Sequence, residues 1–144
     1  MAKSFSQVVD DWASQTEERI DAVHARSVEL LGEEMAKTRN EGGRVPFLTG
    51  NLARSVLASK TGMPNVSDGP FEGSNVGLVA ATLKARETVW LGYQAKYAPR
   101  RNYGYVGSDS LGRVYNQQGA YFIDHAVANW PSIVSKAIKE VRGS

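Results

Sequence analysis

The sequence predicts an α+β fold with a long N-terminal helix, a small antiparallel β-sheet with long loops, and a C-terminal helix. Apolar residues recur every three or four positions at both ends of the chain, which is typical of amphipathic helices. Between these ends lie an alternating apolar pattern, typical of a strand, and two stretches rich in glycine and other turn residues. With 144 residues, the chain is expected to form a single domain over 1–144.

Residues 1–41 are expected to form one long amphipathic helix. Ser4 and Gln7 match a capping box at its start, and Gly32 in its interior indicates either a bend or a close contact. About 35 helical residues at 1.5 Å each span about 50 Å, whereas a domain of this size is roughly 30 Å across. We therefore expect part of this helix to contact another subunit. Its apolar or small residues are Phe5, Val9, Trp12, Thr16, Ile20, Val23, Ser27, Leu31 and Met35.

Residues 47–98 are expected to hold a turn with a short helical piece, followed by strands. The first strand starts over 56–59, and the Gly-, Pro- and Asn-rich stretch 60–75 follows as a surface loop. The stretches 76–83 and 88–94 are predicted as two further strands joined by a hairpin turn, because apolar residues alternate clearly in the second. One face of this sheet should be buried.

Residues 99–120 are expected to form a loop rich in Gly, Tyr and Arg, and residues 121–142 a C-terminal helix. Pro131 either kinks this helix or opens a second helix at its first turn. Tyr and Arg are enriched at protein interfaces. The same mixture also suits a path for nucleic acid or ordinary loop packing, and these alternatives stay open. The candidate interface residues are Lys96, Arg100, Arg101, Tyr103, Tyr105, Arg113 and Tyr115.

The net charge of +2 is unevenly distributed along the chain. Residues 1–41 carry five basic and nine acidic side chains, a balance of −4, and residues 42–144 carry twelve basic and six acidic side chains, a balance of +6. Such a division is consistent with two solvated faces. It equally suits an assembly in which the acidic part of one copy meets the basic part of the next.

The residue inventory argues against an enzyme. The chain has no Cys, and it contains none of the common phosphate-binding, dinucleotide-binding, zinc-protease or serine-hydrolase motifs. Asp124 and His125 are the nearest acid–base pair, but adjacent helical residues do not face each other. We therefore expect no catalytic, cofactor-binding or metal-binding residues. No apolar run approaches the roughly 18 residues of a membrane span, so the sequence predicts a soluble protein.

One short motif follows the first helix and a Pro. Thr49-Gly50-Asn51-Leu52-Ala53-Arg54-Ser55 matches the pattern Thr-Gly-x-Leu-x-x-Ser. On physical grounds, Thr49 would cap a helical turn and Gly50 would allow a close backbone approach. Leu52 would anchor the turn in the core, and Arg54 would project from it.

Two further pieces follow in order. Tyr97-Ala98 with Gly104 downstream is similar to a Tyr-Ala pair followed by an acidic residue and Gly, and Asn102 stands where the acid is expected. The third piece is similar to an aromatic-to-Ala opening of a C-terminal helix, with Phe122 and Ala126 as its ends: Tyr121-Phe122-Ile123-Asp124-His125-Ala126.

Together, the order and spacing of these pieces resemble the tail-component or tail-completion proteins of lambdoid-type long-tailed phages, prophages and gene transfer agents, which sit at the neck where tail meets head. The resemblance implies a small virion protein without enzymatic activity or cofactor, made in the bacterial host cytoplasm and assembled as a ring, of six subunits, around the DNA channel. Its implied partners are its own copies, neighbouring head-connector and tail proteins, and DNA that passes without sequence recognition. No membrane is implied.

Two alternatives accompany this expectation. A tail terminator or a head-completion (stopper) ring protein would share the size and the oligomeric habit. A DNA-binding accessory protein would use the twelve basic residues after residue 41 and would bind duplex with an affinity that falls steeply with salt.

Overall fold

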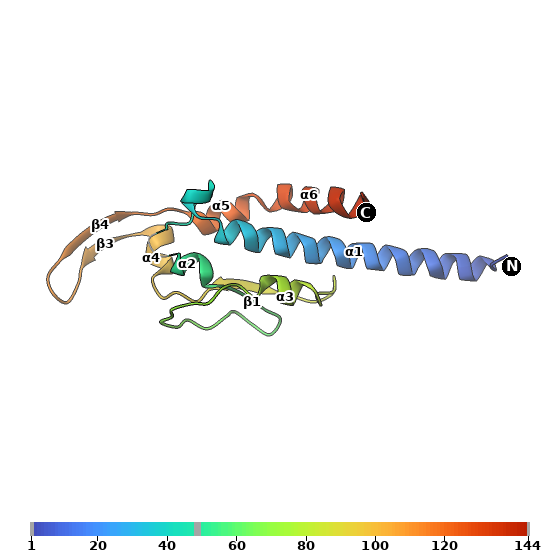
Figure 1. Cartoon of the computed structure of the whole chain (residues 1–144), viewed down its shortest axis with the longest axis horizontal. Helices are drawn as coiled ribbons and strands as arrows, with labels where there is room; N and C mark the ends of the chain where they lie inside the picture. Colours follow the sequence, from blue (N-terminus) through green and yellow to red (C-terminus); the bar gives the residue numbers. More distant parts are fainter. Residues whose placement is uncertain (1, 48–49, 144) are drawn as a thin grey trace.

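The computed structural model describes residues 2–47 and 50–143. These residues form the predicted mixed α+β fold, with a long N-terminal helix, two small antiparallel two-stranded sheets, and a C-terminal helix that packs on the first helix (Figure 1). Two sheets form where one was predicted.

The first helix, α1 (Phe5–Ala36), begins at the predicted capping box, in which the Gln7 N–H donates to Ser4 Oγ at 3.3 Å. Thirty-two residues correspond to about 48 Å of helix. The prediction that it continues to residue 41 is wrong, because Lys37 adopts an extended backbone and the chain then forms a 3₁₀ turn, η1 (Arg39–Glu41). A parallel bridge between Thr38 and Val45 draws the backbone out of the helical path.

The C-terminal half of α1 is the centre of the first hydrophobic cluster. Val28 and Met35 are buried there against strand β1 (Val56–Ser59) and helix α3 (Val76–Ala80). Gly32 marks a close contact between α1 and α3 rather than a bend, because a Cβ at this position would lie 2.7 Å from Val76 Cγ1.

The predicted strand over 76–83 is wrong, because this stretch contains α3. Its buried residues are Val76 and Ala80, which a step of four places on one face of the helix, and Leu83, which follows the helix. A short apolar run of this kind fits a strand and a buried helix equally well. Strand β2 (Trp90–Tyr93), predicted over 88–94, pairs antiparallel with β1 instead of with the stretch 76–83.

The prediction of a loop over 99–120 is also wrong. This stretch holds most of α4 (Ala98–Tyr103) and an antiparallel hairpin of β3 (Gly104–Ser108) and β4 (Val114–Gln118). The turn is built by Asp109, whose Oδ1 accepts the N–H groups of Leu111 and Arg113, each at 2.9 Å. The other predicted loop, over 60–75, contains no helix or strand.

The second hydrophobic cluster lies beside the first and is centred on Phe122. Tyr93 joins the two clusters: its ring meets Phe122 edge-on at 5.1 Å, and its hydroxyl donates to the Met35 carbonyl at 2.6 Å. Burial raises the pKa of Tyr93 well above its ordinary value. The cluster's buried residues are Val45, Leu52, Phe71, Ala95, Ala98, Ala120 and Phe122.

The C-terminal part consists of two helices, α5 (Phe122–Ala128) and α6 (Trp130–Arg142). Pro131 lies in the first turn of α6, so it opens a second helix, as one of the two sequence-based alternatives has it. Helix α6 runs antiparallel along α1 (Figure 1). Arg26 Nε donates to Glu140 at 2.5 Å across this contact and lowers the pKa of that carboxyl group. No helix in the described part of the chain is both long and apolar enough to span a membrane.

Substituting Gly32 tests the close packing of α1 on α3. Because Val76 fills the space beside Gly32, Gly32→Leu should lower the free energy of unfolding by about 1–3 kcal/mol in urea denaturation. Gly77→Leu is the matched control, since a Cβ at Gly77 meets open space and the helical propensity of Leu is higher. Equal stability of the two variants would contradict the packing described here.

Candidate assembly surfaces

The N-terminal half of α1 extends beyond the body of the molecule (Figure 1). Every residue from Phe5 to Gln15 is exposed, including Phe5 at 84% and Trp12 at 67%. Large apolar side chains on a regular helix normally pack against a partner. We refer to residues 5–20 as the projecting segment.

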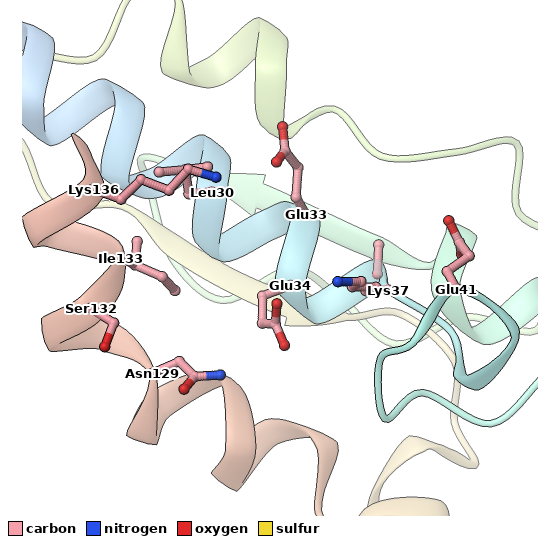
Figure 2. A pocket seen from close by; sticks show the side chains of 10 residues that line it. Leu30, Glu33, Glu34, Lys37, Glu41, Asn129, Ser132, Ile133 and Lys136 are labelled. Atoms are coloured by element: carbon pink, nitrogen blue, oxygen red, sulfur yellow. The ribbon is translucent and has the colours of Figure 1, made fainter. Parts of the chain in front are cut away.

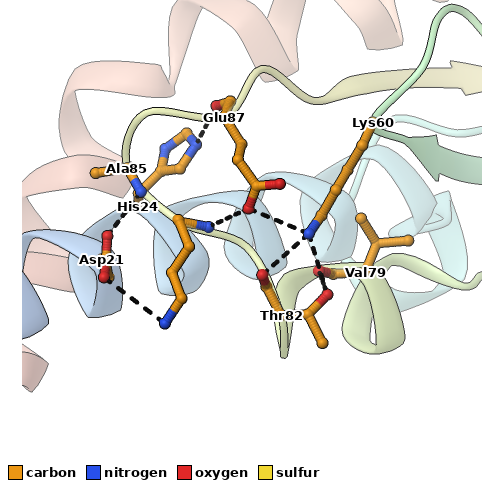
Figure 3. Close-up of polar contacts among 8 residues, drawn as sticks. Asp21, His24, Lys60, Val79, Thr82, Ala85 and Glu87 are labelled. Carbon is orange, nitrogen blue, oxygen red and sulfur yellow. Dashed lines mark hydrogen bonds and ion pairs between the residues drawn. The ribbon is translucent and has the colours of Figure 1, made fainter.

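A polar cluster marks the point at which α1 joins the body (Figure 3). Asp21 accepts the Ala85 N–H at 2.8 Å, and His24 Nε2 lies 3.3 Å from the Glu87 carbonyl oxygen. Lys60 Nζ donates to the Glu87 carboxylate at 3.2 Å. Hydrogen bonds from the Lys84 backbone and from Lys60 lower the pKa of Glu87. These contacts fix α1 from Asp21 onward.

The apolar stripe of the projecting segment continues into an open groove between α1 and α6. The groove has a volume of about 530 Å³ and is mostly apolar, although Ser27 Oγ is buried at this site without a hydrogen-bond partner among the described residues. Its apolar lining residues include Ile20, Val23, Trp130, Val134 and Ile138.

The β3–β4 hairpin lies at the opposite end of the molecule from the N-terminus (Figure 1). Residues that face each other across the ladder share one side, so Tyr105 and Tyr115 lie on one face of the hairpin, and Val106 and Val114 on the other. The valines are 77% and 82% exposed. We call their side the valine face. The sequence-based list of interface residues includes the tyrosines of this hairpin but not the valines. Tyrosine and valine alternate between glycines in this stretch, and that alternation is the pattern that could have indicated the valines.

Several predicted interface residues come together on the tyrosine face. The guanidinium of Arg100 lies 4.2 Å from the ring centroid of Tyr105, and the rings of Tyr105 and Tyr115 are 6.1 Å apart. Arg113 pairs with Asp109 at 2.5 Å, and this hydrogen bonding lowers the pKa of Asp109 despite an opposing desolvation effect. The charged side chains of Arg100, Arg113 and Asp109 are therefore already engaged in contacts within the chain.

The other predicted interface residues lie apart from this face. Lys96 pairs with Asp68 at 2.9 Å, Tyr103 is exposed at the end of α4, and Arg101 is half-buried. Arg101 lines an open groove of about 970 Å³ together with Tyr97 and residues of the Thr-Gly-x-Leu motif.

The motif residues meet mainly in the core. Leu52, Ala98 and Phe122, one from each motif, are all buried in the second cluster. Ala126 belongs to the first cluster. Thr49 lies outside the described residues. These positions therefore shape the fold, and Leu52 anchors its turn as predicted.

The remaining motif residues hold local backbone geometry. Gly50 and Gly104 have φ angles of +78° and +88°, and a Cβ at Gly104 would lie 2.5 Å from the Gln117 carbonyl oxygen. Tyr97 accepts a hydrogen bond from Asn51 at 3.2 Å, which links the first two motifs. Arg54 folds back, and its Nε donates to the Phe71 carbonyl at 3.0 Å.

Asn102 links the base of the hairpin to α5. Its side chain is buried, its Oδ1 accepts the Ile123 N–H at 2.9 Å, and its Nδ2 donates to Asp124 at 3.4 Å. Its own carbonyl accepts the Tyr121 N–H at 2.9 Å. An amide both donates and accepts here, which a carboxylate in its place could not do.

A third groove, of about 610 Å³, lies between the end of α1 and α6 (Figure 2). Glu33 and Glu34 point to different sides of α1 in this view. Glu34 Oε1 lies 3.2 Å from His125 Nε2. Asp124 instead contacts Asn102, so the adjacent Asp124 and His125 do not pair with each other. Within the described residues, no group of three His, Asp or Glu side chains is arranged to hold a metal ion.

Comparison with family models, curated proteins and solved structures finds no match to this chain. The resemblance to tail-completion proteins therefore stays a prediction from its three motifs. The geometry itself offers two exposed elements at opposite ends of one chain, and such elements are suited to binding other proteins.

Asn102→Ala tests the link between hairpin and α5. It would leave the Ile123 N–H and the Asp124 carboxylate without these partners, so the free energy of unfolding should fall by about 1–3 kcal/mol. Asn116→Ala, at an exposed position on β4, should change it by less than about 0.5 kcal/mol. Chemical denaturation measures both, and an Asn102→Ala chain as stable as the control would refute the role assigned to this amide.

Proposed function

We propose that this chain is a structural virion protein of a phage neck, acting in tail completion or head–tail joining as an oligomeric ring around the DNA channel. The observation that carries the proposal is the pair of exposed elements at opposite ends of the molecule, the projecting segment and the β3–β4 hairpin. The resemblance of the three sequence motifs to those of tail-completion proteins is the reason for proposing a phage particle.

Both elements need a partner on physical grounds. The projecting segment leaves Phe5 and Trp12 exposed on a regular helix, and the hairpin leaves Val106 and Val114 exposed. Exposed apolar side chains that gather in this way are typical of protein interaction sites. In a ring of identical subunits, each copy uses two different surfaces, one toward each neighbour. Two exposed elements at opposite ends of one chain provide such a pair of surfaces.

The charges of the hairpin region favour a protein interface over DNA binding. Arg113 is paired with Asp109, Arg100 is stacked on Tyr105, and Lys96 is paired with Asp68. Side chains engaged in this way are less available to neutralise phosphates. A tail terminator or a stopper ring would use the same surfaces at another place in the particle.

Inactivating the gene in the phage or prophage that carries it tests the function. Electron microscopy should reveal DNA-filled heads and finished tails that are not joined, and the intact gene should restore joined particles. Overlong tails would point to a terminator, and heads that lose their DNA to a stopper; either result overturns tail completion. Normal joined particles would overturn a neck function altogether.

Complementation with variants connects this function to the projecting segment. A gene carrying Val9→Ser with Trp12→Ser should fail to restore joining, since both side chains are exposed and are expected to act only in contacts between subunits. Val127→Ser, at an exposed position on α5, is the matched control and should restore it.

A further inference from the structure

We propose that the projecting segment of one copy packs against the valine face of the β3–β4 hairpin of the next copy. This inference rests on the proposed ring and specifies the contact between its subunits. It assigns a partner to the two most exposed elements of the chain.

The apolar side chains of the two elements suit each other. Phe5, Val9 and Trp12 form one stripe along the projecting segment, and Val106 with Val114 forms the centre of the valine face. The tyrosine face is a poorer partner, because Arg100 already covers Tyr105. Burying the stripe on the valine face removes apolar surface of both elements from water.

The charges of the two elements are opposite. Residues 5–20 carry four acidic side chains and one basic side chain, a balance of −3, whereas residues 96–118 carry four basic and one acidic, a balance of +3. The ion pairs of Asp11 with Lys3 and of Lys96 with Asp68 offset one charge of each balance. In the described part of the chain, Asp10 and Glu17 have no ion-pair partner. On the hairpin side, Arg113 is paired with Asp109, and Arg100 lies over Tyr105 on the face opposite the valines. Opposite net charge of this kind steers the approach of the two elements.

Like charge disfavours the symmetric alternative. If two projecting segments paired with each other, two surfaces that each carry a balance of −3 would face one another. A contact between the acidic helix and the basic hairpin region avoids this repulsion.

The dimensions also agree. The sixteen residues of the projecting segment span about 24 Å, and the five-residue strands of the hairpin about 17 Å, so the stripe can lie along most of the ribbon. Because the two surfaces lie at opposite ends of each copy, the contact repeats from copy to copy and closes as a ring when the rotation allows it.

Cross-linking tests the contact directly, because the chain contains no Cys. Ala13→Cys places one thiol beside the apolar stripe of the projecting segment, and Ser110→Cys places one in the hairpin turn; both residues are exposed. When the two variants are mixed and treated with a short bismaleimide, covalent dimers should form that contain one of each. Ser135→Cys, exposed on α6, is the matched control and should not join to Ala13→Cys.

The outcomes separate this inference from the proposed ring. Dimers of Ala13→Cys with itself, or oligomers in light scattering without mixed dimers, would overturn the contact and leave the ring proposal standing. A monomer at all concentrations, with no cross-links, would overturn both.

Charge reversal gives an independent readout. Asp10→Lys with Glu17→Lys changes one flank of the apolar stripe, and Arg100→Glu with Arg101→Glu changes the hairpin base. Each pair should weaken association at least about tenfold. Mixing the two variant chains should restore association between unlike chains, because each such contact joins either two reversed surfaces or two unchanged ones. If the mixture associates no more strongly than either variant alone, the assigned pairing is wrong.

Discussion

The burial of one half of α1 is the constraint from which the rest of the arrangement follows. Val28 and Met35 are enclosed by α3 and β1, and Gly32 permits an approach that any larger residue would block. Helix α6 packs along the same half of α1, where Arg26 bonds to Glu140. Because the capping box starts the helix more than twenty residues before Val28, the other half extends beyond the body, and its residues from Phe5 to Gln15 are all exposed in the described structure.

The hairpin depends on the second cluster in a similar way. Phe122 contacts Tyr93 and so ties α5 to the sheet of β1 and β2, and Asn102 then ties the hairpin base to α5. Both exposed elements are thus fixed at one end to a packed body. Such elements hold their direction and still offer their surface to a neighbour, which is what assembly from identical subunits requires.

Much of this fold could be predicted from the sequence. The regular spacing of apolar residues and the Ser4–Gln7 box located α1, and Pro131 located the start of α6 as one of two alternatives. The stretch 76–83 was assigned wrongly because its apolar run fits either a strand or a helix, and contact with Gly32 on α1 decides between them. The hairpin within 99–120 was missed because its glycines and exposed side chains resemble those of a loop. The contacts of Asn102 depend on tertiary structure, which no local pattern reveals.

Amide hydrogen exchange tests most directly whether another copy completes α1. The wild-type chain would be compared at low and high concentration, with peptides resolved by mass spectrometry. The account predicts that residues 5–20 and 104–118 gain protection together as the concentration rises, while residues 130–142 stay unchanged. Fast exchange of residues 5–20 at every concentration, or protection of this segment without the hairpin, would contradict it.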